Sequence, residues 1–443
     1  MGSEALEQPR YVCAIGAQQT VLAIPRAIPI VHAGPGCSSK ISGALGDQAG
    51  LQGAGYAGGS AVPSTNFSES EVVFGGEQKL RSTIDGTLKV MDGDLFVILT
   101  GCTSDIVGDD VTSIAAEYRQ SGFPVVNAET GGFKGNNYLG HELVMLAIIE
   151  QFLGNGQESP VDPGLVNVFS VIPCQDAFWR GDLRTIKMLL ERLGLRANIL
   201  FGYDSAGLGE WRNIPSARFN LVLSPWVGLE TARTLETRYG TPFLHWPALP
   251  VGAVETSRFL RAIGDFAQID PRIVKSVIDD EEEIFYGYLG SAADFLTEAR
   301  NGLPLLFHAV ADSAYALALG RFLVNEMGFS PGLICATENP PESERCQVSV
   351  QFEDLAGDFG PVVFENDGGL IQDRLDQALD TERGALILAS SWEKDLAARH
   401  DGHLLRVSLP IYDRLIMGHS YLGYEGGLRF LEDIYNLVLG KSA

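Results

Sequence analysis

Short apolar runs alternate with amphipathic, helix-like stretches along almost the whole chain. Continuous apolar runs of about 4–8 residues are typical of strands buried on both faces of a parallel sheet. Their alternation with helical patterns predicts doubly wound α/β units. We therefore expect an α/β protein with mostly parallel sheets. The expected strands are 27–31, 94–99, 165–172, 197–202, 219–224, 241–246, 303–310, 330–337, 384–390 and 403–410.

Two stretches divide this pattern into three parts. The segment LGNGQESPVDPG (153–164) is rich in Gly, Pro and polar residues, and the long helical stretch 271–301 ends at NGLP, where a new strand begins. A chain of 443 residues is long enough for several domains, since one domain has roughly 100–200 residues. The predicted domains are 1–160, 161–301 and 302–443.

The chain carries 56 acidic and 32 basic side chains, a formal net charge of −24. A field of this sign repels phosphate backbones, so we expect no nucleic-acid partner. No run reaches the roughly 18 apolar residues of a membrane-spanning helix, and the N-terminus lacks a signal-peptide pattern. We therefore expect a cytoplasmic protein without membrane contact. Six cysteines are too few for a disulfide framework, which leaves metal ligation, nucleophilic chemistry or burial.

Three of these cysteines lie near the N-terminus, beside glycines. Cys37 follows the glycine turn of VHAGPGCSSK (31–40), Cys102 follows LTG, and Cys13 lies in YVCAIGA. The first two come after predicted strands, where doubly wound sheets bind ligands. Thiolates hold iron–sulfur clusters, and glycine directs N–H groups at anionic sulfur. Three separate buried cysteines remain the alternative. Three ligands are also one fewer than a simple cluster needs, so a second chain would have to complete the site.

Five segments, in this order, resemble the nitrogenase component 1 superfamily. The most specific are VHAGPGC, VVFGGEQKLRSTI (72–84) and LTGCTSDIVGDDV (99–111). The segment that begins LVLSPW (221–252) resembles the second-domain segment of the family. The segment that begins LPIYDRLIMGHSYLGYEGG (409–434) resembles the matching segment of its β-type subunits. The resemblance spans nearly the whole chain.

The resemblance implies three Rossmann-like domains and a partner α-type subunit, usually in an (αβ)₂ heterotetramer. It also implies an 8Fe-7S-like iron–sulfur cluster shared between the two subunits, and an ATP-dependent iron protein that docks and delivers electrons. The β-side cluster ligands fall on Cys13, Cys37 and Cys102, with Gly36 and Gly101 expected to lie against the cluster. No Walker A motif occurs, so we do not expect this chain to bind ATP.

Departures from the family pattern indicate which subunit this is. Gly132, in ETGGFKGNNYLGH, stands where molybdenum nitrogenase β subunits place a serine near the cluster, so an extra oxygen ligand is not expected. The two positions that hold the substrate-reducing cofactor in α-type subunits fall near Ser224 and Asp413. Neither supplies the cysteine or histidine of those subunits. The chain is therefore expected to be the β-type, electron-relaying subunit and not to hold that cofactor.

Other conspicuous residues have simpler interpretations. We expect Cys174 and Cys335 to be packed and Cys346 to be a bystander in a Pro/Glu-rich loop. His32 is expected to order the cysteine loop through a hydrogen bond rather than to bind metal. Asp109 and Asp110 are both expected to cap the helix that follows.

Three family members fit the sequence. The first is the β subunit of a nitrogenase-like reductase, with methylthio-alkane reductase, which cleaves C–S bonds of small organosulfur compounds, as the most specific interpretation. The second is a cofactor-assembly scaffold, disfavoured because such chains typically lack the full set of three cysteines. The third is a true nitrogenase β subunit, disfavoured because Cys13 leaves no room for a long N-terminal extension. Dark-operative protochlorophyllide reductase fits less well, since its corresponding chain uses a different ligand set.

Overall fold

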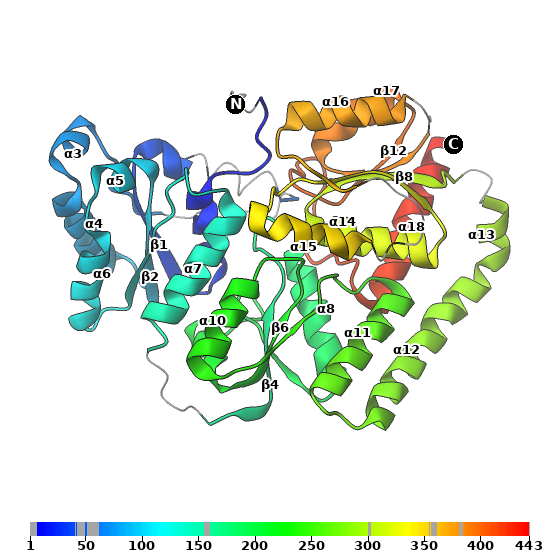
Figure 1. Ribbon diagram of the computed structural model, residues 1–443, viewed down its shortest axis with the longest axis horizontal. Coiled ribbons are helices and arrows are strands. Elements are labelled where there is room, and N and C mark those ends of the chain that lie inside the picture. Colours follow the sequence, from blue (N-terminus) through cyan, green and yellow to red (C-terminus); the bar gives the residue numbers. More distant parts are fainter. Residues whose placement is uncertain are drawn as a thin grey trace.

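Three parallel sheets form the frame of the protein in the computed structural model (Figure 1). Residues 7–39, 41, 49–50, 62–154, 160–299, 303–353, 355, 361–380 and 384–442 are described. In the described residues the sheets have three, four and five strands. Within each sheet, every pair of neighbouring strands is parallel. The predicted α/β class with parallel sheets is confirmed.

The first sheet has the strand order β1-β2-β3 and lies at the blue-to-cyan end of the molecule in Figure 1. Its strands are buried along their whole length. The elements of this part are η1 (Ala14–Ala17), α1 (Gln18–Ala23), β1 (Ala27–His32), α3 (Glu69–Phe74), α4 (Glu77–Val90), β2 (Leu95–Thr100), α5 (Cys102–Val107), α6 (Val111–Gln120), β3 (Val125–Ala128) and α7 (Asn137–Gln151).

The second sheet has the order β5-β4-β6-β7. Three buried asparagines, one on each of β5, β4 and β6, join its strands. Asn198 donates to Asn167 at 2.7 Å, and Asn167 donates to Asn220 at 2.8 Å. The elements are β4 (Asp162–Phe169), α8 (Trp179–Arg192), β5 (Arg196–Asn198), α9 (Leu208–Asn213), η3 (Ile214–Ser216), β6 (Ala217–Val222), α10 (Leu229–Tyr239), β7 (Phe243–His245), α11 (Gly252–Phe266), α12 (Pro271–Ser291) and α13 (Ala293–Ala299).

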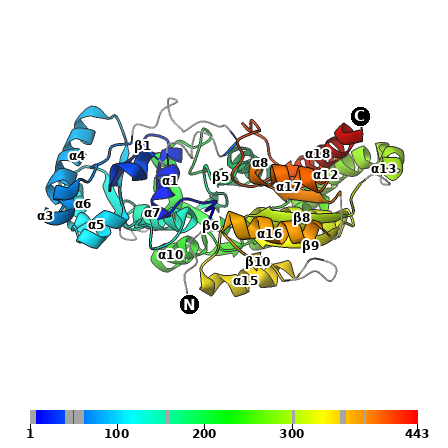
Figure 2. The same ribbon diagram turned by 90° about the horizontal axis from the view of Figure 1, so that it is seen from above.

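The third sheet has the order β10-β9-β8-β11-β12. It lies at the opposite end of the molecule from the first sheet when the protein is seen from above (Figure 2). Its elements are β8 (Leu306–Ala311), α14 (Ser313–Arg321), η5 (Phe322–Glu326), β9 (Ser330–Ala336), α15 (Glu342–Phe352), β10 (Val363–Phe364), α16 (Gly368–Leu379), β11 (Leu386–Ala389), η6 (Ser391–Glu393), α17 (Lys394–Arg399), β12 (His403–Arg406) and α18 (Gly423–Ser442).

The expected strands all have counterparts, with shifted ends. The strand expected at 165–172 runs from Asp162 to Phe169. The strand expected at 197–202 is shorter than predicted, because β5 covers only Arg196–Asn198. The strands β3 and β10 were not predicted. Each sheet lies within one predicted domain range, but the domain boundaries stay a prediction, because residues 155–159 and 300–302 are outside the described part of the chain.

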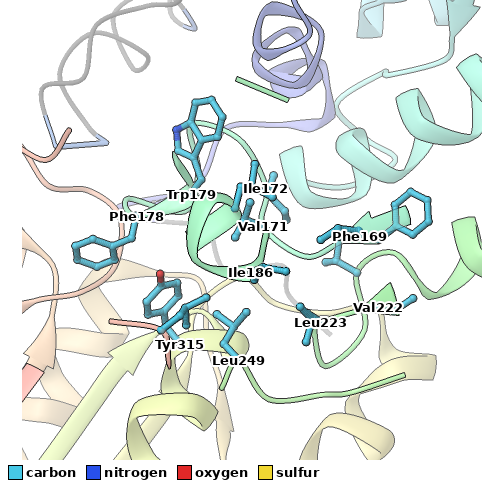
Figure 3. Packing of buried hydrophobic residues seen from close by; sticks show 14 of the residues in the cluster. Phe169, Val171, Ile172, Phe178, Trp179, Ile186, Val222, Leu223, Leu249 and Tyr315 are labelled. Carbon is cyan, nitrogen blue, oxygen red and sulfur yellow. The ribbon is translucent and has the colours of Figure 1, made fainter. Parts of the chain in front are cut away.

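One hydrophobic cluster runs through all three parts of the molecule. Figure 3 shows part of this cluster, where Ile186 and Leu223 lie between Phe169 on one side and Phe178 and Tyr315 on the other. The helix α18 returns from the third part to pack against α11 and α12 of the second. The parts therefore share buried surface and are not independent bodies.

The N-terminal segment also ties two parts together, and this fixes the first cysteine. The Gly368 N–H donates to the Gln8 carbonyl oxygen at 2.8 Å, and Arg10 forms an ion pair with Glu393 in which both side chains are 0% exposed. Further on, the Asn137 N–H donates to the Val12 carbonyl oxygen at 3.0 Å. The chain thus passes from the third part to α7 of the first immediately before Cys13.

Among the described helices, none combines the length and the apolar character that a membrane crossing would need.

Candidate metal centre

The ends of three adjacent strands define one edge of the first sheet. β1 and β2 pair in register up to His32 and Thr100, and β2 and β3 pair up to Leu99 and Ala128. The loops that follow all leave from this edge, because the strands are parallel. Cys37 follows β1, Cys102 follows β2, and Gly132 follows β3. The sheet topology therefore brings together residues far apart in sequence.

Each of the three cysteines lies at or near the start of a helical segment. Cys102 is the first residue of α5, and Cys13 is the residue before η1. Cys37 is the third residue of a helical segment that starts at residue 35. The N–H groups at helix N-termini have no intrahelical partner and favour negative charge, which suits a thiolate.

Gly132 lies between two of the cysteines. A Cβ atom built on Gly132 would be 3.1 Å from the Sγ atom of Cys13 and 3.1 Å from that of Cys102, so the two sulfur atoms are at most about 6 Å apart, twice that distance. The Gly132 N–H donates a hydrogen bond to the Cys102 Sγ atom at 3.0 Å. The sequence identified Gly132 only as a departure from the family pattern, and its role as a donor to sulfur was missed.

Hydrogen bonds hold the loop of Gly132 in this place. The Thr130 N–H donates to the Thr100 Oγ1 atom at 3.0 Å, and the Thr130 hydroxyl donates to the Thr100 carbonyl oxygen at 2.8 Å. On the other side, the Ala14 N–H donates to the Gly135 carbonyl oxygen at 2.9 Å. The loop is thus fixed both to the end of β2, beside Cys102, and to the residue after Cys13.

A cavity of about 1130 Å³ opens beside these residues. Cys13, Cys37 and Gly132 line it together with Thr103, the neighbour of Cys102. Its other walls come from the second and third parts of the molecule, through Trp226 and residues 339–342. All three predicted ligands are therefore on or beside one cavity.

The two predicted glycine contacts differ from each other. Gly36 lines the cavity, and no atom lies within 4 Å of the position its Cβ would take. Gly101 is packed instead, because a Cβ there would lie 2.5 Å from the Cβ of Ala33. The absence of a side chain at Gly101 lets the ends of β1 and β2 approach, and this indirectly places Cys102.

His32 is buried and forms a hydrogen bond, as expected, but its partner corrects another prediction. The His32 Nε2 atom lies 3.0 Å from the Asp109 Oδ2 atom, and burial lowers the pKa of His32, so the neutral ring donates this bond. Asp109 also accepts the Gly76 N–H at 2.9 Å. Only Asp110 caps α6, by accepting the Ser113 N–H at 3.0 Å. Asp109 is therefore a buried link and not a cap.

Gly76 allows this link by having no side chain, and we predict a cost for adding one. A Cβ at Gly76 would lie 2.3 Å from the Phe67 ring and 2.8 Å from the Asp109 Oδ2 atom. Gly76→Ala is expected to lower the free energy of unfolding by about 1–3 kcal/mol, measured by urea denaturation. Gly86→Ala on α4, where no atom is within 4 Å, is the control and should stabilise by about 0.5–1 kcal/mol. Equal effects would contradict the packing described for Gly76.

The remaining cysteines lie elsewhere. Burial raises the pKa of the Cys174 and Cys335 thiols to about 12, so both stay protonated. Cys335 packs in β9 beneath α16, as predicted. Cys346 is exposed on α15, which corrects its placement in a loop.

The residues at the cavity fit an iron–sulfur cluster. Within the described residues, no three His, Cys, Asp or Glu side chains converge as one metal ion requires. A cluster contains several irons and needs no such convergence. Two sulfur atoms at most about 6 Å apart, a third cysteine on the same cavity and an N–H donated to sulfur match the thiolate ligands and hydrogen bonds that clusters use.

The side chains at the two positions that correspond to ligands of a substrate-reducing cofactor, Ser224 and Asp413, form other interactions in this chain. The buried Ser224 hydroxyl oxygen accepts the Val227 N–H at 3.1 Å. Asp413 pairs with Arg406 at 2.7 Å and accepts the Ser391 hydroxyl. Both side chains hold local structure in this chain.

Comparison with known proteins extends these observations to the whole chain. The sequence matches the family described as Nitrogenase component 1 type Oxidoreductase over residues 13–439. It is 23% identical to the nitrogenase molybdenum-iron protein beta chain of Methanococcus maripaludis, with 99% of this chain and 95% of that one covered. It is also 23% identical to a chain of the light-independent protochlorophyllide reductase of Angiopteris evecta, over 82% of this chain and 70% of that one.

A solved structure entitled "Nitrogenase Cp1 at pH 6.5" shares the fold, with a TM-score of 0.80 at 20% identity, covering 100% of this chain and 95% of that one. Because 95% of the Methanococcus maripaludis beta chain is covered, chain length does not separate this protein from that nitrogenase beta chain, although the Azotobacter vinelandii beta chain is covered over only 83% of its length. The position of Cys13 therefore does not exclude a nitrogenase beta subunit.

Proposed function

Because the chain belongs to the nitrogenase component 1 type oxidoreductase family, we propose that it is a β-type, electron-relaying subunit that holds half of an 8Fe-7S-like cluster. The observation that carries this proposal is the approach of the Cys13 and Cys102 sulfur atoms to within about 6 Å around Gly132, with Cys37 on the same cavity. An α-type partner supplies the remaining ligands, in an (αβ)₂ heterotetramer.

The residues of this chain have distinct tasks in the proposal. Cys13, Cys37 and Cys102 hold the cluster through sulfur, and the cluster when bound accepts and releases single electrons. The Gly132 N–H bond to Cys102 lowers the electron density on that sulfur, which favours the reduced state. The walls around Trp226 and residues 339–342 exclude water on one side, and the partner covers the other.

The redox partner, an ATP-dependent iron protein, is proposed to dock on α3 and α5. Val72, Val73 and Phe74 at the end of α3 are exposed, Phe74 by 87%, and Ile106 on the adjoining α5 is 76% exposed. Exposed apolar residues of this kind mark protein-interaction surfaces. Because α5 begins with Cys102, a protein bound there would be close to the cavity.

For the reaction of the complex we propose reductive cleavage of a C–S bond in a small organosulfur compound, as in methylthio-alkane reductase. A thioether R–S–R′ then takes up two electrons and two protons and gives R–H and R′–SH. Gly132 supports this assignment over molybdenum nitrogenase, because no side-chain oxygen reaches the two sulfur atoms from that position. A purified complex that reduces dinitrogen but no thioether would instead identify a nitrogenase β subunit, the alternative that the similar beta chains favour.

Iron loading tests the proposal. Cys37→Ala and Cys102→Ala, each in the αβ complex, are expected to reduce bound iron at least roughly 10-fold, since even loss of an outer-shell partner costs about 10–100-fold in metal affinity. Cys346→Ala, on the exposed face of α15, is the matched control and should keep the iron. Iron content and EPR spectra measure the result. Full iron content in both variants would contradict the assignment of Cys37 and Cys102 as cluster ligands. A co-purified α-type partner that lacks its own cofactor ligands would favour the cofactor-assembly scaffold.

A further inference from the structure

Four carboxyl side chains are buried where the strand ends of the second and third sheets meet. Asp176 follows β4, Asp182 lies on α8, Asp312 directly follows β8, and Glu338 follows β9. Their residues are between 0% and 7% exposed. We call these four the junction carboxyls. This edge is where doubly wound sheets usually bind ligands, but here side chains fill it.

Hydrogen bonds join the junction carboxyls to all three parts of the molecule. Asp182, in the second part, accepts bonds from the third part. Glu338, in the third part, accepts bonds from the second part and from its own part. Asp176 accepts a bond from the first part. Figure 3 shows the Tyr315 ring in this region, close to Phe178. The donors are the Tyr315 hydroxyl and the Ser420 hydroxyl (2.6 Å) to Asp182, Trp226 Nε1 (3.2 Å) and Ser313 N (2.9 Å) to Glu338, Tyr315 N (3.0 Å) to Asp312, and Ile172 N (2.6 Å) and the Tyr138 hydroxyl (3.5 Å) to Asp176.

Among the described residues, the junction carboxyls have no compensating cation. Within the described part of the chain, none of the four forms an ion pair, and the charged groups that perturb them are chiefly one another. The other titratable groups facing them are Tyr11 before η1, Tyr138 on α7 and Tyr315 on α14, and burial raises the pKa of each. Burial raises the pKa of Asp182 and Glu338 to about 7, that of Asp312 to about 6, and that of Asp176 well above its usual range.

One of the junction carboxyls, Glu338, lies directly behind the wall of the cysteine cavity. Trp226 lines the cavity and donates its indole N–H to Glu338. Asn136 lines the cavity and donates to the Glu338 carbonyl oxygen, and Asn339, the next residue, is also part of the wall. Charges separated by so little low-dielectric material interact strongly. A change of charge in the cavity therefore changes the affinity of Glu338 for a proton, and the charge of Glu338 acts in turn on Asp312 and Asp176.

We propose that the junction carboxyls are a proton-storing network that compensates the charge of electrons held in the cavity. This inference rests on the proposed function. When the redox partner adds one electron, a junction carboxylate takes one proton from solvent, and the proton returns to solvent when the electron leaves. Only an O–H bond forms and breaks. The network thus makes this subunit a site of proton-coupled electron storage in addition to an electron conduit.

A redox titration of the αβ complex at several pH values tests the proposal. Raising the pH from about 6 to about 8 removes protons from the network and adds negative charge behind the cavity. The cluster midpoint potential should therefore fall across this range in the wild type. The double variant Asp182→Asn with Glu338→Gln cannot lose these protons, so it should lose at least half of the fall. Glu326→Gln is the matched control, because burial raises the pKa of Glu326 to about 7 as well, but it binds the Ala253 N–H and lines no part of the cavity.

Infrared spectra of the same complex report the protonation of the junction carboxyls directly, without a signal from iron. The C=O stretch of protonated carboxyl groups should be present at pH 6, decrease as the pH rises, and be smaller in the double variant. A wild type without this band, or a double variant that holds iron and keeps the full pH dependence of the potential, would overturn the inference while the proposed function stands. A wild-type complex without iron would contradict the proposed function instead. If the double variant fails to fold, Glu338→Gln alone replaces it.

Discussion

Replacing Gly132 with valine is expected to reduce the iron content of the αβ complex at least roughly 10-fold, with the fold retained. The Cβ alone would be 3.0 Å from the Cys13 Cβ and 3.1 Å from both sulfur atoms, so the sulfurs must move apart. The two methyl groups of valine then occupy space that the cluster needs. Iron per complex, measured with the melting temperature of the same preparation, separates loss of the centre from loss of the fold.

The control for this prediction is another glycine that accepts a side chain. Gly209 lies on α9, is exposed, and has no atom within 4 Å of its Cβ position. Gly209→Val should keep the iron content of the wild type. If Gly132→Val also keeps all its iron, the loop of Gly132 does not lie against the metal centre and the assignment of Cys13 and Cys102 fails.

The second large effect is expected at the buried ion pair of Arg10 and Glu393. Arg10 also donates to the Ser390 hydroxyl oxygen at 3.1 Å, and its guanidinium lies 5.4 Å from the centre of the Trp392 ring. Arg10→Met leaves the Glu393 carboxylate buried without its cation, and Glu393→Gln leaves the guanidinium without its anion. Each single change should lower the free energy of unfolding by about 3–5 kcal/mol, measured by urea denaturation.

A double-mutant cycle and a surface pair control this prediction. The double variant Arg10→Met with Glu393→Gln removes both charges, so it should be less destabilised than the two single effects together. Lys275→Ala breaks the exposed pair with Asp279 on α12 and should cost at most about 1 kcal/mol. Single variants at Arg10 and Glu393 that cost no more than Lys275→Ala would show that the N-terminal segment is not held by this pair.

The sequence was sufficient for the parts of the fold that depend on local patterns. The apolar runs 94–99 and 384–390 predicted strands correctly because β2 and β11, which they mark, are buried along their whole length and so leave a continuous apolar signal. β3 was missed because it has only four residues and includes Asn127, and β10 because it has only two. The break at Ala292 between α12 and α13 was not predicted, because it has no proline and Gly290 lies inside α12 rather than after its end.

The candidate site required the three-dimensional structure. The positions of Cys37 and Cys102 after strands could be read from the sequence, but their proximity to Cys13 depends on the N-terminal segment held by Arg10. Asp109 looked like a helix cap because it precedes α6, and only the fold shows that it faces His32 and Gly76. The junction carboxyls had no local signature, since each belongs to a different loop or helix and they meet only through the packing of the sheets.

Anomalous X-ray diffraction at the iron edge, on crystals of the αβ complex, tests the central claim most directly. The proposal predicts a compact group of iron peaks in the cavity beside Gly132, within bonding distance of the sulfur atoms of Cys13, Cys37 and Cys102, and continued by ligands of the partner chain. A complex with both chains ordered and no iron peak at these three sulfurs would contradict it.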